Sequence, residues 1–286
     1  MTFTIVTDST SDLPISWVQE NDVTVLGLTI NLDGVTYETV GENRLTSGEL
    51  LEKMATGGQP TTSQVNVGQF EEIFESAAKE GKEVLYLAFS AALSGTYQSG
   101  VIARDMVLDA YPDAVIKIVD TKAAAIGEGY LVMQAAQARA AGKSLAETKA
   151  LIEELVPRLR TYLLVDDLNH LVRGGRLSKA AALIGGLVNI KPLLSLNAEG
   201  KLEAIAKIRG RKKGIKEMLN LTLDGLDHST VMVAYTGDLE AAAAIKATLL
   251  EDSRVTDVLL TELGPIIATH TGTGVLAILS INKEER

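Results

Sequence analysis

The 286-residue chain contains no cysteine, and its only histidines are His170, His228 and His270. The absence of thiols excludes disulfide bonds, cysteine nucleophiles and cysteine-based zinc sites, and it fits a reducing compartment. The histidines are far apart in the sequence and no H-E-x-x-H motif is present, so the usual pattern of a metal centre is missing as well. We therefore expect no metal and no other cofactor.

Long hydrophobic runs are also missing. The most apolar windows, residues 180–188 and 275–281, are far shorter than the roughly 20 residues needed to cross a bilayer. The first residues, MTFTIVTDST, have neither the positive region nor the long apolar region of a secretory signal, so we expect a cytoplasmic protein. Hydrophobic residues still make up 46% of the chain and charged residues 22%, a balance typical of globular proteins.

Positive charge is in short supply, with 27 Lys and Arg against 37 Asp and Glu, a net charge of -10. This deficit argues against a general nucleic-acid binder, which needs a basic face. The acids are concentrated in residues 1–155, with 10 Lys and Arg against 22 Asp and Glu, a net charge of -12. Residues 156–286 hold 17 Lys and Arg against 15 Asp and Glu, a net charge of +2.

Within the second half, residues 207–216 contain six cations and no acid. Such a basic run indicates docking of a protein partner or transient contact with a membrane surface, and a solvated helix face is the alternative. The cations of the run are Lys207, Arg209, Arg211, Lys212, Lys213 and Lys216.

Strand-like and helix-like patterns alternate in the first half of the chain. The β-branched runs at residues 3–6, 84–87 and 115–119 are each followed by apolar residues at helical spacing. This alternation predicts βαβ units with parallel strands. Two helix starts also carry capping signals, one in Ser11-Asp12-Leu13-Pro14 and one in the capping-box pattern of Thr46-Ser47-Gly48-Glu49.

The pattern changes after about residue 158. Residues 190–196 and 202–208 read as two strands, and the four residues between them include Gly200, which predicts a β-hairpin. We therefore predict a two-domain α/β protein. Residues 1–158 form the N-terminal domain with a parallel sheet, and residues 159–286 form a mixed α+β domain.

Five polar clusters could carry chemistry, and each also has a structural interpretation as a turn or a helix cap. Ser94-Gly95, at a predicted helix start, could bind an anion through free N–H groups. His270 lies among small and hydroxyl-bearing residues, which favours a site over a core position. The clusters are residues 7–12, 60–64, 90–98, 173–178 and 268–274.

Taken together, these segments resemble the DegV family of bacterial fatty-acid-binding proteins. The resemblance runs in one order from residue 6 to residue 274 and so covers nearly the whole chain. The matching segments are VTDSTSDL (6–13), PTTSQ (60–64), LSGTYQS (93–99), VDT (119–121), LVRGGRLS (171–178), KPLL (191–194) and HTGTG (270–274).

The resemblance implies that the chain is not itself an enzyme but the lipid-binding subunit of a fatty acid kinase. Such a subunit holds a long-chain fatty acid in a ligand tunnel between its two domains and presents the carboxylate to a separate ATP-using subunit. Thr62, Ser94 and His270 would contact the carboxylate, and Arg173 would lie near it. The kinase would dock on the basic run that includes Lys207, Arg209, Arg211 and Lys212.

Two other functions remain open at this point. One is a serine esterase or thioesterase with Ser94 as nucleophile and His270 as base, although Ser94 is not in a G-x-S-x-G motif and no orienting acid is evident. The other is a sugar-phosphate-binding module that uses the predicted helix N-terminus.

Overall fold

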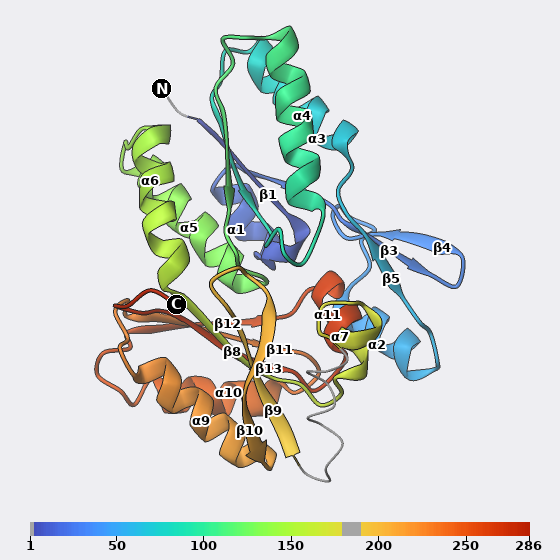
Figure 1. The fold of residues 1–286 in the computed structure, drawn as a ribbon, viewed down its shortest axis with the longest axis vertical. Helices are drawn as coiled ribbons and strands as arrows, with labels where there is room; N and C mark the ends of the chain where they lie inside the picture. Colours follow the sequence, from blue (N-terminus) through green and yellow to red (C-terminus); the bar gives the residue numbers. More distant parts are fainter. Residues whose placement is uncertain (1–2, 179–189) are drawn as a thin grey trace.

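The computed structural model describes residues 3–178 and 190–286, so the apolar segment 180–188 lies outside the described residues. Within them the chain forms three β-sheets with helices packed around them (Figure 1). None of the described helices is long and apolar enough to cross a membrane.

The first sheet is parallel, as predicted, with the strand order β2-β1-β6-β7. Three of its strands begin and end within two residues of the predicted runs. Helices cover both faces of the sheet, and all five residues of β6 are therefore buried. Its strands are β1 (Thr4–Asp8), β2 (Val23–Leu26), β6 (Val84–Ala88) and β7 (Ile116–Asp120). The helices on its faces are α3 (Val67–Lys79), α4 (Thr96–Ala110), α5 (Ile126–Ala140) and α6 (Leu145–Leu155).

The second sheet has six strands in the order β10-β9-β8-β13-β11-β12. Only the pair β11–β12 is parallel, and the predicted hairpin is confirmed as the antiparallel pair β9–β10. Helices α9 (Arg211–Leu223) and α10 (Leu239–Leu249) pack on one face (Figure 1). The strands are β8 (Leu159–Leu164), β9 (Ile190–Leu196), β10 (Leu202–Arg209), β11 (Thr230–Tyr235), β12 (Asp257–Glu262) and β13 (Leu276–Ile281).

One hydrophobic core joins these two sheets. Leu87 of β6, Leu131 of α5 and Leu279 of β13 belong to the same buried cluster. The mixed α/β fold is thus confirmed. Along the chain, the strands of the first sheet all precede the short helix η2 (Val156–Arg158), and those of the six-stranded sheet all follow it. The division into domains at residue 158 stays a prediction.

A third, antiparallel sheet was not predicted. It contains β3 (Thr29–Leu32), β4 (Val35–Glu38) and β5 (Thr61–Ser63) in the order β4-β3-β5. We expected one residue of the 60–64 cluster to cap the following helix, and this was wrong. The residues form β5 because they pair with β3, and the cap of α3 is Asn66.

The capping predictions have opposite outcomes. The capping box of Thr46 and Glu49 is present at the start of α2 (Ser47–Ala55). The cap predicted within Ser11-Asp12-Leu13-Pro14 is wrong, because no side chain caps α1 (Ile15–Glu20). Ser11 instead belongs to the short helix η1 (Ser9–Ser11) and is buried, and its Oγ donates to the carbonyl oxygen of Asp8 at 2.8 Å.

Candidate functional site

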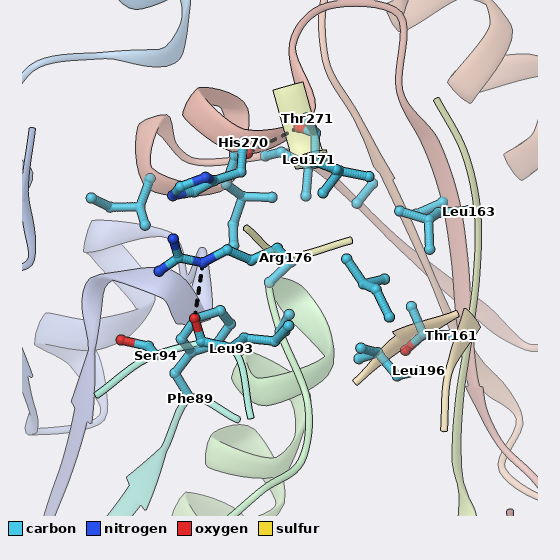
Figure 2. Close-up of a pocket in the computed structure, with 18 of the residues that line it drawn as sticks. Phe89, Leu93, Ser94, Thr161, Leu163, Leu171, Arg176, Leu196, His270 and Thr271 are labelled. Atoms are coloured by element: carbon cyan, nitrogen blue, oxygen red, sulfur yellow. Dashed lines mark hydrogen bonds between the residues drawn. The ribbon is translucent and has the colours of Figure 1, made fainter. Parts of the chain in front are cut away.

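A largely apolar cavity lies between the parallel sheet and the six-stranded sheet (Figure 2). One of its lining residues, Phe89, directly follows the carboxyl end of β6. Ligands of open α/β sheets usually bind at this end of the strands. The six-stranded sheet contributes Thr161, Leu163, Leu196, Leu202, Ala234, Ala277 and Leu279. The other apolar walls are Leu28, Phe89, Leu93, Ala124, Ala125, Leu171, Leu263, Ile266, Ile267 and Val275.

Most of the polar groups of the cavity lie at one end, and the hydroxyl of Thr161 is an exception. His270, Arg176 and Ser94 lie on one side in Figure 2, whereas Thr161 and Leu196 lie on the other. Such an arrangement suits a ligand with a small polar head and a long apolar body.

This polar end is close to the protein surface. Gln64 and Gly95 line the cavity beside Ser94, and both are exposed to solvent. The Nε2 of Gln64 donates to the carbonyl oxygen of Gly95 at 3.3 Å and to Oγ of Ser99 at 2.8 Å. A β-carbon on Gly95 would lie 2.1 Å from Oε1 of Gln64, so a larger residue here would have to displace the Gln64 side chain.

Ser94 lies directly before α4, as the sequence predicted. Its Oγ accepts a hydrogen bond from the backbone N–H of Thr96 at 3.2 Å and lies 2.9 Å from Oγ1 of Thr96. The hydroxyl is thus held at the positive end of a 15-residue helix. A negatively charged ligand group is favoured at this position.

Thr62 and His270 meet across the chain at the same end of the cavity. Oγ1 of Thr62, on β5, lies 2.9 Å from Nε2 of His270, on α11 (Pro265–Thr271). The ring is close-packed on its other side, because a β-carbon on Gly174 would lie 2.2 Å from Nδ1. The predicted site residues Thr62, Ser94 and His270 therefore all line one cavity.

The imidazole of His270 is neutral at physiological pH. Burial, reinforced by the nearby guanidinium groups of Arg176 and Arg173, lowers its pKa to about 4. A neutral ring can donate one hydrogen bond and accept another, without adding a positive charge to the site.

The two arginines of the R-G-G-R loop have different positions. Arg176 lines the cavity, and its Nε donates to the carbonyl oxygen of Leu93 at 3.0 Å. Arg173, the arginine named from the sequence, is exposed at the end of α7 (Asn169–Arg173), and its Nη2 lies 2.9 Å from Nδ1 of His170. Its charge still reaches His270, but the described cavity lining does not include it.

The arrangement gives no support to a serine esterase. Ser94 pairs with Thr96, and His270 pairs with Thr62, so the described residues contain no hydrogen bond from the serine to the histidine. No carboxylate orients the ring of His270 within this part of the chain either. The pairs that activate a serine nucleophile are therefore not formed.

The first polar cluster, for which the sequence allowed either a ligand site or a structural role in a turn or cap, forms a buried network. Oγ1 of Thr7 donates to Oε1 of Glu128 at 2.8 Å, and Oγ1 of Thr10 lies 2.5 Å from Oδ1 of Asp8 and 2.9 Å from Oε2 of Glu128. Burial raises the pKa of Glu128 well above its usual value, and the charge of Asp8 raises it further. One hydroxyl proton cannot serve both contacts of Thr10, so a proton on the carboxyl of Asp8 or Glu128 completes the network. Burial raises the pKa of both, and the larger rise at Glu128 favours the proton there. None of these residues lines the cavity.

The basic run lies on the edge of the six-stranded sheet. Lys207 and Arg209 of β10 are exposed, as is Lys212 of α9, and none of these three forms an ion pair within the described residues. Arg211 differs, because its Nη1 lies 3.1 Å from Oδ1 of Asp166 and its Nη2 lies 2.8 Å from Oδ2 of Asp238.

Arg211 also connects the basic run to the site. Its Nη1 donates to the carbonyl oxygen of Gly274 at 2.8 Å. Gly274 is in the loop that follows His270 and α11. The start of α9 is thereby held close to the polar end of the cavity.

Arg176 is the cavity residue that the sequence interpretation missed. It lies in the same glycine-containing segment as Arg173, and the sequence of this segment does not indicate which of the two guanidinium groups faces the cavity. No group of three or more metal-binding side chains occurs among residues 3–178 and 190–286.

Known proteins resemble this chain over its full length. A family model described as "Uncharacterised protein, DegV family" matches residues 2–283. A DegV domain-containing protein of Streptococcus pyogenes serotype M1 is 55% identical over 286 residues, which cover 100% of both chains.

Solved structures resemble it as well. A DegV family protein from Thermus thermophilus, described by its fatty acid binding, is 35% identical with a TM-score of 0.89, covering 99% of this chain and 100% of the other. A stearic acid-binding protein from Eubacterium ventriosum is 25% identical with a TM-score of 0.86, covering 98% of each chain.

Proposed function

Because the chain belongs to the DegV family, we propose that it binds one long-chain fatty acid in the cavity between the two sheets. The observation that carries this proposal is the one-sided distribution of polar groups in an otherwise apolar cavity. The solved relatives described as fatty-acid-binding proteins support it. The acyl chain would lie along the leucine-rich walls, and the carboxylate would lie beside Thr62, Ser94 and His270.

The energetics of such a ligand are favourable. A saturated chain of about 15 methylenes gains roughly 12 kcal/mol on burial, before the costs of association and ordering. The carboxylate needs hydrogen-bond donors, since an unpaired charge in an apolar cavity costs several kcal/mol. The hydroxyls of Thr62 and Ser94 would supply them, and Ser94 is held in place by the first N–H group of α4.

The position of the proton on the His270 ring determines which hydrogen bonds the hydroxyl of Thr62 can form. If Nε2 carries the proton, it donates to Oγ1 of Thr62, and the hydroxyl proton of Thr62 is then free for the carboxylate. Burial, together with the positive charges of Arg176 and Arg173, keeps the ring from taking a second proton. The neutral tautomer protonated on Nε2 is therefore the form that suits carboxylate binding.

We further propose that the protein presents this carboxylate to a separate ATP-dependent kinase subunit and does not catalyse the reaction itself. A carboxylate oxygen would attack the γ-phosphorus of ATP, the bond to the ADP oxygen would break, and acyl phosphate and ADP would form. Hydroxyl donors hold the carboxylate without neutralising it, so it stays nucleophilic. Exposed Gln64 and Gly95 place this end near the surface, where a kinase could reach it.

The kinase would dock on the exposed cations Lys207, Arg209 and Lys212. The alternative is that the two cations of β10 only protect a sheet edge from pairing with another chain. The bond from Arg211 to Gly274 favours docking, because it holds the basic run close to the carboxylate end.

The test of ligand binding is mass spectrometry of an organic extract of the purified protein. We expect one long-chain fatty acid per chain. A protein that carries no lipid and binds no added stearic acid would overturn the proposal, and retention of a sugar phosphate instead would point to the alternative module.

The test of presentation uses the variant Arg209→Glu and the control Lys143→Glu, which reverses an exposed charge between α5 and α6. With the kinase subunit and ATP present, Arg209→Glu should lower acyl-phosphate formation about tenfold or more and leave stearic acid binding unchanged. Equal activity of both variants would contradict docking at this surface.

A further inference from the structure

The wall of the cavity contains one hydroxyl that has no partner. Thr161 of β8 lines the cavity and is 7% exposed. Its Oγ1 is buried and has no hydrogen-bond partner among residues 3–178 and 190–286. The other hydroxyls of the cavity described above, those of Thr62 and Ser94, are both hydrogen-bonded.

The residues around Thr161 give no structural reason for a hydroxyl group at this position. On the same face of β8, Leu159 and Leu163 are apolar and buried. Across the sheet Thr161 pairs with Leu279 of β13. Valine has the same shape and would avoid the cost of about 1–3 kcal/mol for a buried hydroxyl without a partner.

A hydroxyl in this place can be satisfied by a ligand in the cavity. Figure 2 shows Thr161 on the opposite side of the cavity from Ser94 and His270. It is therefore well away from the proposed carboxylate position and faces the apolar part of the ligand.

We propose that Thr161 determines specificity by hydrogen bonding to an oxygen substituent, such as a hydroxyl or keto group, on the apolar chain of the bound fatty acid. This inference rests on the proposed function and adds the substrate class to it. A hydroxyl oxygen on the chain accepts a full hydrogen bond and donates one in return, so both partners are satisfied. A double bond offers only a weak acceptor, and a saturated chain offers none.

The position of Thr161 also limits where the oxygen lies on the chain. A substituent next to the carboxyl group would meet Thr62 and Ser94, not Thr161. The preferred ligand thus carries its oxygen in the middle or distal part of the chain.

The experiment compares wild type with Thr161→Val, which removes the hydroxyl and keeps the shape. Displacement of a fluorescent fatty acid gives affinities for stearic acid and for a positional series of mid-chain and distal hydroxystearic acids. The matched control is Thr148→Val on α6, because Oγ1 of Thr148 is also buried without a partner in the described chain but lies outside the cavity lining.

For wild type and Thr148→Val, we expect at least one hydroxystearic isomer to bind as tightly as stearic acid or more tightly. Thr161→Val should lose about tenfold in affinity for that isomer and should bind stearic acid equally well or slightly better. Melting temperatures of the three proteins show whether the variants remain folded.

Two results would overturn the inference. One is a Thr161→Val variant that binds every isomer as wild type does, and the other is a wild type that binds every isomer at least tenfold more weakly than stearic acid. Both differ from failure of the proposed function, in which wild type would bind neither stearic acid nor any isomer.

Discussion

Oγ1 of Thr62 lies 2.9 Å from Nε2 of His270, although 208 residues separate them in the chain. The contact joins β5 of the small antiparallel sheet to α11. The polar end of the cavity is therefore complete only when the small sheet packs against this helix. Two segments that are short and polar in the sequence thus form one site because β3 holds β5 in place.

Loss of the Thr62 hydroxyl should weaken fatty acid binding. Thr62→Val keeps the shape of the side chain and removes both the contact with His270 and the proposed donor to the carboxylate. We expect about tenfold weaker binding of stearic acid in a displacement assay. Thr61→Val is the matched control, since Thr61 is the preceding residue of β5 and is exposed. Equal losses in both variants would contradict a specific role for Thr62.

The charge state of His270 should be visible in an NMR titration of the free protein. Burial, reinforced by the charges of Arg176 and Arg173, predicts a pKa of about 4 for this ring. Stearic acid should raise that pKa, because a carboxylate nearby stabilises the imidazolium. A pKa that does not move when stearic acid binds would place the carboxylate elsewhere.

The same lowered pKa predicts a loss of stability in acid. In the unfolded chain a histidine takes up its proton near pH 6.5, whereas folded His270 does so only near pH 4. The stabilisation is thus complete above pH 6.5 and is lost as the pH falls toward 4, by at most about 3 kcal/mol. Urea unfolding at several pH values should show this slope, and His270→Asn should reduce it.

Some parts of the fold could be predicted because their signals are local. The alternation of strand and helix patterns predicted β1, β6 and β7. The hairpin β9–β10 followed from two apolar runs and a glycine-containing turn. Each of these signals lies within a few residues of the element that it describes.

The rest depends on contacts between distant residues. Residues 61–63 are polar, which is typical of a loop, and they form a strand because they pair with β3. Arg173 and Arg176 share one loop, and the packing of α7 decides which of them faces the cavity. Glu128 lies in a helix, where an acidic side chain is usually exposed to solvent. Here it is buried, and its carboxyl group is hydrogen-bonded to Thr7 and Thr10.

The protonated state of Glu128 leads to a prediction about two substitutions. Glutamine reproduces a protonated glutamate, since its amide can donate to Thr10 and accept from Thr7. Glu128→Gln should therefore leave the free energy of unfolding at neutral pH within about 1 kcal/mol of wild type. Glu128→Ala should lose about 3 kcal/mol, because it removes the buried hydrogen bonds of Thr7 and Thr10 to this carboxyl and opens a cavity.

Stability against pH distinguishes a protonated from an ionised Glu128. A raised pKa means that the folded carboxyl keeps its proton above pH 4.5, where the unfolded one loses it. Stability contributed by this group is thus present below pH 4.5 and decreases as the pH rises toward the folded pKa. Glu128→Gln should remove this decrease. If Glu128→Gln were instead much less stable than wild type at neutral pH, Glu128 would be ionised in the folded wild type.

Arg211 and Lys212 should separate a structural role from a docking role in the basic run. Arg211 is bonded to Asp166, Asp238 and Gly274, whereas Lys212 is exposed and has no ion pair within the described residues. Arg211→Ala should lower the free energy of unfolding by about 1–2 kcal/mol and weaken fatty acid binding, because it frees the loop after His270. Lys212→Ala should leave stability and binding unchanged and lower acyl-phosphate formation with the kinase subunit. If Arg211→Ala kept full stability and binding while losing only kinase coupling, Arg211 would belong to the docking surface after all.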